Sequence, residues 1–166
     1  MFYGDIIGQN RLKNQLKKMI FESQMPQCQL FIDSKGYGGL PLALYSAMGL
    51  LHGFDVFEGE EKNRTPIQKL RGHPDLHFVY PVINKSSGNP KAVSDYYRST
   101  WDDFLQNEPY GSIQDWISML EAGNKQGMIG VEEVSRIHHK MYLKAHNGGH
   151  KVMILFGADK LSEKAS

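Results

Sequence analysis

The sequence is poor in the residues that build covalent or metal-held frameworks. Its 166 residues include a single cysteine, Cys28. One thiol can form neither an intramolecular disulfide nor a cysteine-cluster metal site, which excludes a small disulfide-stapled domain. A lone cysteine is typical of proteins in a reducing compartment, so we expect a cytoplasmic location.

Long hydrophobic runs are also missing. No segment approaches the ~20 apolar residues that a transmembrane helix requires. The first ten residues, MFYGDIIGQN, lack the basic start and apolar middle of a secretion signal. We therefore expect no membrane as a partner.

Neither sign of charge is in excess. The chain has 19 Lys and Arg against 18 Asp and Glu, a formal net charge of +1. Proteins that bind phosphate backbones by themselves are strongly basic, so charge alone does not indicate a nucleic-acid ligand. The composition, 40% hydrophobic and 22% charged, is that of a globular chain. The length suits one domain with a sizeable core.

Hydrophobic periodicity predicts alternating helices and strands. The predicted helices are 12–20, 40–52, 94–106, 113–120 and 131–141, and the predicted strands are 28–33, 77–82 and 151–156. A short helix is also expected at 67–70, within a polar connector over 54–72. Strands that alternate with helices predict an α/β fold with a mainly parallel sheet.

One glycine-rich turn lies where a phosphate-binding loop would lie, between a predicted strand and a helix. Such a loop has the pattern GxxxxGK[ST], in which backbone amides hold the phosphates, Lys neutralises them and the hydroxyl binds magnesium. The sequence here is DSKGYGGLPLA. With Asp33 and Gly38 at the two glycine positions, Gly39 replaces the lysine and Leu40 the hydroxyl. Taken alone, the segment favours an ordinary loop between a strand and a helix, with glycines for tight turning.

Five segments, taken in order, carry a family resemblance. They are FYGDIIGQNRLKNQL, LFIDSKGYGGLPLALYSA, HPDLHFVYP, IGVEEVSRI and KVMILFGADKLSEKA. Together they resemble the N-terminal AAA+ domain of bacterial DNA polymerase III clamp-loader subunits, most closely the delta-prime type, with the gamma/tau type as a further relative. His73, Pro74 and Asp75 before a strand are the most specific part of the match.

The resemblance implies a P-loop AAA+ three-layer sandwich. Residues 1–166 would be its N-terminal part, with a helical insertion at about 84–130, and would stop before the lid and collar domains and leave an unfinished sheet edge. Motor subunits of the family use ATP to load the sliding clamp onto primed DNA, whereas the delta-prime type is a stationary partner. The implied partners are the other loader subunits and, through the complex, the clamp and primed DNA.

The resemblance also assigns residues to a vestigial nucleotide site. The adenine side corresponds to Ile6, Ile7 and Gly8, and the phosphate loop to Lys35, Gly36, Gly38, Gly39 and Leu40. In the family, one strand normally ends in an acidic pair. Phe156 and Gly157 stand at the two corresponding positions of this sequence. The phosphate lysine, the magnesium hydroxyl and the acidic pair are all replaced. Since phosphoryl transfer depends on positioned positive charge and metal, we expect no catalytic residues and no ATPase activity.

The resemblance implies no cofactor either. Family members often carry a zinc-binding cysteine cluster before the HisProAsp motif, and residues 54–72 contain no cysteine. His52, His73 and His77 without thiolates make a poor structural zinc site, and His73 beside Pro74 is expected to stabilise a turn. Weak ATP binding by the backbone of the glycine-rich turn remains compatible with the sequence.

Two alternatives stay open. The chain would be an active P-loop ATPase of the gamma/tau type if Lys35 served the phosphates unconventionally, or it would be another nucleotide-binding α/β domain. The aromatic residues of 84–130 are expected to belong to the core, because helically spaced aromatics usually do, whereas an exposed aromatic patch would indicate a subunit contact.

Overall fold

The computed structural model describes residues 6–33, 36–54, 70, 72–84, 93–121, 123, 125–146 and 149–164. The elements in chain order are α1 (Asn10–Phe21), α2 (Gly39–His52), β1 (Leu76–Val79), the 3-10 turn η4 (Ser94–Tyr97), α4 (Arg98–Asn107), α5 (Ile113–Met119), α6 (Val131–Tyr142), β2 (Val152–Leu155) and the 3-10 turn η5 (Ala158–Lys160).

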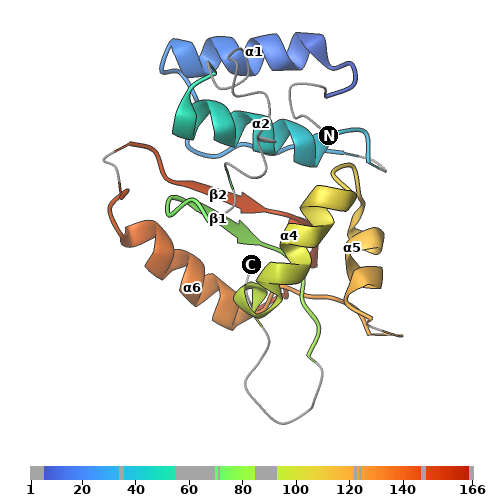
Figure 1. Cartoon of the computed structure of the whole chain (residues 1–166). Helices are drawn as coiled ribbons and strands as arrows, with labels where there is room; N and C mark the ends of the chain where they lie inside the picture. The colour runs from blue at the N-terminus through green and yellow to red at the C-terminus, as the bar shows by residue number, and fades with distance from the viewer. Residues whose placement is uncertain are drawn as a thin grey trace.

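Two parallel strands form the sheet of the described residues. β1 pairs with β2 in a register that places Leu76 opposite Val152 and Val79 opposite Leu155. Helices α1 and α2 lie on one side of the strand pair and α6 on the other, while α4 and α5 lie near the carboxyl ends of the strands (Figure 1). This mixture of helices with a small parallel strand pair is compatible with the predicted α/β class.

All five long helices predicted from periodicity are present, with ends that differ by a few residues. The strands predicted at 77–82 and 151–156 are also present, as the shorter β1 and β2. Of the short helix predicted at 67–70, only Leu70 lies within the described residues.

The prediction of a strand at 28–33 is wrong. These residues form no strand, and no backbone hydrogen bond joins them to another described residue. Leu30 and Ile32 are 77% and 89% exposed. A strand exists only through its ladder partners, and a short apolar run does not reveal whether a neighbour is there to pair with it.

The centre of the core is aromatic, and the described part of 84–130 supplies most of it. Trp101, Phe104 and Trp116 are almost fully buried, with ring centroids 5.1 to 5.6 Å apart. Tyr80 stacks on Trp101 at 4.3 Å. The expectation that these aromatics belong to the core is confirmed, although Tyr96 is 58% exposed.

A second, smaller cluster joins α1 to α2. Ile6, Leu16 and Leu42 are buried there. Helix α2 faces both clusters, because Leu42 packs toward α1 while Leu44 and Met48 pack into the aromatic core. Pro41 is accommodated in the first turn of α2, where a backbone N–H has no partner within the helix. Both faces of α2 are therefore buried, which fixes the position of the loop before it.

Replacing Phe104 tests the aromatic core. Phe104→Ala should lower the free energy of unfolding by about 3–5 kcal/mol, because it leaves a cavity among buried rings. Urea denaturation followed by circular dichroism measures the change. The matched control is Tyr142→Ala, which removes an 89% exposed ring and should change stability by less than about 0.5 kcal/mol. Equal effects of the two substitutions would contradict this description of the core.

Candidate functional site

The loop before α2 surrounds a carboxylate of the chain itself. Oδ1 of Asp33 accepts a hydrogen bond from the Tyr37 amide at 2.8 Å. Oδ2 accepts hydrogen bonds from the Gly38 and Gly39 amides at 3.1 and 2.7 Å. Successive amides that converge on one point form an anion-binding concavity, and the amino end of α2 adds its positive dipole. The Asp33 carboxylate fills this concavity.

This arrangement differs from an ordinary helix cap. The N-cap residue of α2 is Gly38, which has φ of 108° and makes no side-chain cap hydrogen bond. Asp33 lies five positions earlier and reaches across the loop. A Cβ atom on Gly39 would lie 2.7 Å from Cβ of Asp33. Position 39 is the one aligned with the motif lysine. The space that a side chain would need there is occupied by Asp33.

Tyr110 lies against the other side of the same loop. Its hydroxyl oxygen accepts a hydrogen bond from the Ile7 amide at 2.9 Å, although the two residues are 103 positions apart. A Cβ atom on Gly36 would lie 2.5 Å from the Tyr110 carbonyl oxygen, and one on Gly38 would lie 3.4 Å from the ring. Tyr110 thus fills space between the segment assigned to the adenine side and the glycine-rich loop.

Local structure places Tyr110 there. The Gly111 amide donates to the Glu108 carbonyl oxygen, closing a turn around Tyr110. Ser112 and Asp115 then form a capping box at the start of α5. Hydrogen bonds from the Ser112 hydroxyl and amide lower the pKa of Asp115. Because the turn and cap fix the path of the chain, the aromatic ring between them has little freedom.

Apolar packing occupies the strand ends, where the clamp-loader resemblance would place an acidic pair. Phe156 lies 5.4 Å from Trp101 and 6.0 Å from Phe104 between ring centroids. A Cβ atom on Gly157 would lie 2.6 Å from a methyl carbon of Ile113. The Trp116 indole N–H donates to the Pro81 carbonyl oxygen at 2.7 Å. Helix α5 and the aromatic core therefore cover the carboxyl ends of β1 and β2.

The remaining residues that the resemblance assigns to a nucleotide site have mixed surroundings. Ile6 is buried and its carbonyl accepts from Lys13, whereas Ile7 is 77% exposed. Gly8 has φ of 67° and precedes Gln9, whose side-chain amide donates to the Tyr37 carbonyl oxygen at 3.4 Å. Leu40 is buried in the aromatic core. Lys35 lies outside the described residues.

The HisProAsp motif makes structural contacts at the amino end of β1, away from the glycine-rich loop. Nδ1 of His73 accepts from the Asp75 amide at 3.1 Å, which confirms the turn-stabilising interpretation of His73. The buried Asp75 carboxylate accepts from the His146 amide at 2.8 and 3.0 Å. Pro74, between them, is exposed. The motif therefore ties the start of β1 to the chain after α6.

Two further features bear on metals and membranes. Within the described ranges, no three His, Cys, Asp or Glu side chains are placed to share a metal ion. The rings of His52 and His73 meet edge to face at 4.9 Å, and Cys28 is exposed. Among the helices of the same ranges, none is long and apolar enough to span a bilayer.

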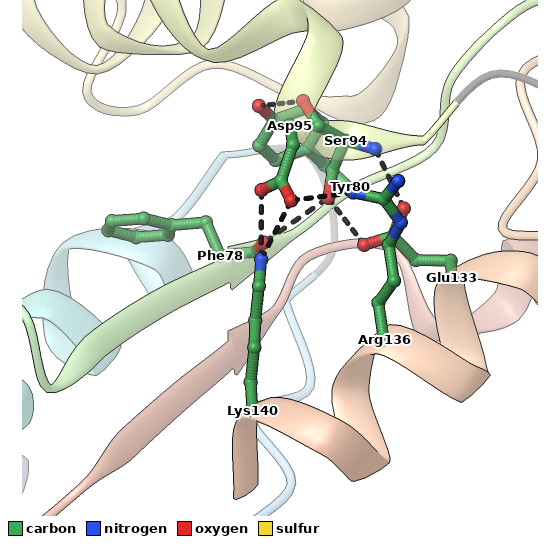
Figure 2. A network of polar contacts seen from close by, with 7 residues as sticks. All are labelled: Phe78, Tyr80, Ser94, Asp95, Glu133, Arg136 and Lys140. Carbon is green, nitrogen blue, oxygen red and sulfur yellow. Dashed lines mark hydrogen bonds and ion pairs between the residues drawn. The ribbon is translucent and has the colours of Figure 1, made fainter. Parts of the chain in front are cut away.

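A separate polar network joins η4 to α6 and β1 (Figure 2). The buried Glu133 carboxylate accepts from the Ser94 amide at 2.7 Å and from its hydroxyl at 2.5 Å. The Tyr80 hydroxyl donates to the Ser94 carbonyl oxygen at 2.8 Å. Asp95 lies between the Lys140 ammonium at 2.8 Å and the Arg136 guanidinium at 3.1 Å. The charged groups of this network neutralise one another.

The network shifts several pKa values without creating a proton-transfer site. Burial raises the pKa of the Tyr80 phenol, and the nearby Asp95 and Glu133 carboxylates raise it further. Burial alone would raise the pKa of Asp95, but Lys140 and Arg136 together hold it below its usual value. The raised pKa keeps the Tyr80 hydroxyl protonated, as its donated hydrogen bond requires. The lowered pKa keeps Asp95 ionised, as its two ion pairs require. We therefore interpret the network as the attachment of η4 to α6.

A pocket lies beside this network, bounded by α2, β1, α4 and α6. Its floor is apolar, with Leu44, Phe78 and Trp101, and His77 and Lys140 lie at its polar side. The Trp101 indole N–H has no acceptor among the described residues. No residue of the glycine-rich loop lines the pocket, so the pocket is distinct from the residues that the resemblance assigns to a nucleotide site.

The chain was compared with protein-family models, curated proteins and solved structures, and none of them matched.

Sequence reasoning identified the loop and placed Asp33 at its first glycine position, but it predicted neither the hydrogen bonds of Asp33 nor the presence of Tyr110. Asp33 at the position of the first motif glycine was a signal, because it introduces a carboxylate next to amides that would otherwise face a phosphate. Tyr110 carried no such signal, since its contact with Ile7 spans most of the chain. Three backbone amides of the loop bind an anion, and that anion is the Asp33 carboxylate of the chain itself.

Removing the Tyr110 hydroxyl tests its contact with the adenine-side segment. Tyr110→Phe should lower the free energy of unfolding by up to about 1 kcal/mol, because the Ile7 amide loses its acceptor. Hydrogen exchange of the Ile7 amide should also become faster. Tyr37→Phe is the matched control: it removes the hydroxyl of a 71% exposed ring in the same loop and should change neither quantity. Unchanged Ile7 exchange in Tyr110→Phe would contradict the contact.

His77 should make stability depend on pH. Burial lowers its pKa below 6.5, the nearby Lys140 and Lys151 lower it further, and Asp75 and Asp95 partly oppose them. The unfolded chain therefore binds a proton at a higher pH than the folded chain does. Stability should fall as pH drops below 6.5 and level off once the folded protein is protonated too.

The measurement is the free energy of unfolding in urea between neutral and mildly acidic pH. His77→Gln should flatten the pH profile. His139→Gln, which removes an exposed imidazole from α6, should keep the wild-type profile. A wild-type profile in His77→Gln would show that His77 does not contribute.

Proposed function

We propose that the chain is the N-terminal part of a catalytically silent AAA+ domain, from a DNA polymerase III clamp-loader subunit of the delta-prime type. In this role it acts as a scaffold during loading of the sliding clamp onto primed DNA. Its direct partners are the other loader subunits, and it meets the clamp and the DNA through the complex. The cytoplasm is the compartment in which such a complex works.

Three features support the proposal. The order of the five sequence segments is that of the family. The described residues have an α/β arrangement with a parallel strand pair. The glycine-rich loop leads into α2, as a phosphate loop leads into the helix that follows it. The near-neutral charge is compatible with a subunit that does not bind DNA alone.

The observation that carries the silent role is the Asp33 contact. Phosphoryl transfer requires positive charge and a metal around the transferred group. Here the three loop amides already hold a carboxylate, and Gly39 and Leu40 supply neither cation nor hydroxyl. Phe156 and Gly157 offer no magnesium ligand at the strand ends, where the packing is apolar. A bound triphosphate would have to displace the Asp33 carboxylate from these amides.

The alternative, an active ATPase of the gamma/tau type or another nucleotide-binding domain, makes the opposite prediction. An active ATPase requires micromolar binding of magnesium ATP with turnover, and a nucleotide-binding domain requires the binding alone. Because the Asp33 carboxylate repels phosphate from the loop amides, we expect neither. Isothermal titration with magnesium ATP, together with a phosphate-release assay, distinguishes the two functions, and an active gamma/tau subunit serves as the positive control.

Association with loader subunits tests the scaffold role directly. The full chain should elute with purified gamma/tau and delta subunits in size-exclusion chromatography, and the assembled mixture should show no ATP turnover beyond that of the motor subunits. Phe104→Ala is the control for folding dependence, because loss of the core should weaken association in proportion to the unfolded fraction. Failure of the folded wild-type chain to associate would end the proposal.

A further inference from the structure

We infer that the pocket bounded by α2, β1, α4 and α6 is a binding site for a small monocarboxylate with a short aliphatic tail. The tail lies on the apolar floor of the pocket. The carboxylate accepts a hydrogen bond from the Trp101 indole N–H and pairs with Arg98. The inference concerns the chain itself and does not depend on a clamp-loader role.

The unpaired indole N–H of Trp101 indicates that the pocket has an occupant. Trp101 lines the pocket and is 1% exposed, and its N–H has no acceptor among the described residues. Trp116, which is buried in the same core, donates to the Pro81 carbonyl oxygen at 2.7 Å. A buried donor without a partner costs free energy, and a molecule bound in an adjoining cavity can supply the missing acceptor. The expected ligand therefore carries a hydrogen-bond acceptor.

The size and lining of the pocket favour a short aliphatic molecule. The cavity volume is about 50 Å³, and Leu44, Leu76 and Phe78 line it beside Trp101. Because a buried water needs about 10–15 Å³, the cavity has room for roughly three to five water-sized groups. A cavity that binds benzene is larger, at about 150 Å³. A tail of a few carbon atoms matches this space.

Arg98 provides a cation at the mouth of the pocket. One face of α4 presents Arg98, Trp101 and Leu105 to the pocket, because residues three and four positions apart lie on the same side of a helix. Trp101 and Leu105 are buried, whereas Arg98 is exposed and makes no ion pair with a described residue. A guanidinium group matches a carboxylate in both charge and geometry. An acceptor that is also an anion therefore fits this face of α4 best.

The electrostatic potential at the polar side of the pocket also favours an anion. Burial is the largest cause of the lowered pKa of His77, and the ammonium groups of Lys140 and Lys151 come next. Each of them acts on His77 more strongly than the Asp75 and Asp95 carboxylates, which oppose them. The positive potential that disfavours a proton on His77 attracts a carboxylate to the same wall.

The test is a titration of the full chain with butyrate, followed by the 15N–1H NMR signals of the two indole groups. The Trp101 signal should shift saturably and downfield, because its N–H gains an acceptor. Trp116 is the internal control and should shift much less, since its N–H already has an acceptor. Butylammonium, which has the same tail and the opposite charge, should bind at least about tenfold more weakly.

Two substitutions on α4 test the charge of the ligand. Arg98→Gln should weaken butyrate binding about two- to fivefold, the range expected for an exposed ion pair. Asp102→Asn should strengthen it, because it removes a negative charge from the pocket wall. The matched control is Arg11→Gln, which removes an exposed guanidinium from α1 outside the pocket lining and should bind butyrate as wild type does.

Circular dichroism identifies which variants are folded, and the wild-type titration needs no variant at all. The inference is overturned if the wild-type Trp101 signal shows no saturable shift, if Trp116 shifts as much, or if butylammonium binds as tightly as butyrate. It is also overturned if folded Arg98→Gln and Asp102→Asn do not change the affinity in opposite directions relative to Arg11→Gln.

Discussion

The packing of Trp101, Phe104 and Trp116 against the ends of β1 and β2 is the constraint on which the rest of this structure depends. These rings connect α4 and α5 to the strand pair, and the Trp116 hydrogen bond to Pro81 fixes their direction. Because α5 is held there, the position of the turn that precedes it is also fixed. Tyr110 reaches Ile7 and the glycine-rich loop as a result. Residues 93–121 therefore supply most of the aromatic centre of the core and also Tyr110, which contacts the glycine-rich loop.

The sequence predicted helices better than strands, for a physical reason. A helix satisfies its backbone within itself, so the apolar stripe of α6 or α5 is enough to identify it. A strand depends on a neighbour that periodicity does not show. Residues 77–82 have β2 as that neighbour, whereas the equally apolar 28–33 have no ladder partner among the described residues.

Part of the candidate site could be predicted from the loop sequence itself, and part depends on contacts between residues far apart in the chain. The missing lysine and hydroxyl were visible in the loop sequence, as was an acidic residue at the first glycine position. What Asp33 does became apparent only from its three hydrogen bonds, and the role of Tyr110 only from a contact 103 positions away. Buried carboxylates follow the same rule, since Glu133 and Asp75 both hold distant backbone amides, and no spacing in the sequence indicates that.

The close approach of Gly39 to Asp33 has a consequence for how this loop can change. Any side chain at position 39 starts with a Cβ atom 2.7 Å from that of Asp33, so a lysine introduced there meets an obstacle before its ammonium group reaches any ligand. Removing Asp33 alone leaves the loop without a lysine, and adding the lysine alone distorts the loop. A lysine at position 39 thus requires a second substitution that removes Asp33. The contact with Asp33 thus favours glycine at position 39 for a steric reason, whatever the function of the chain.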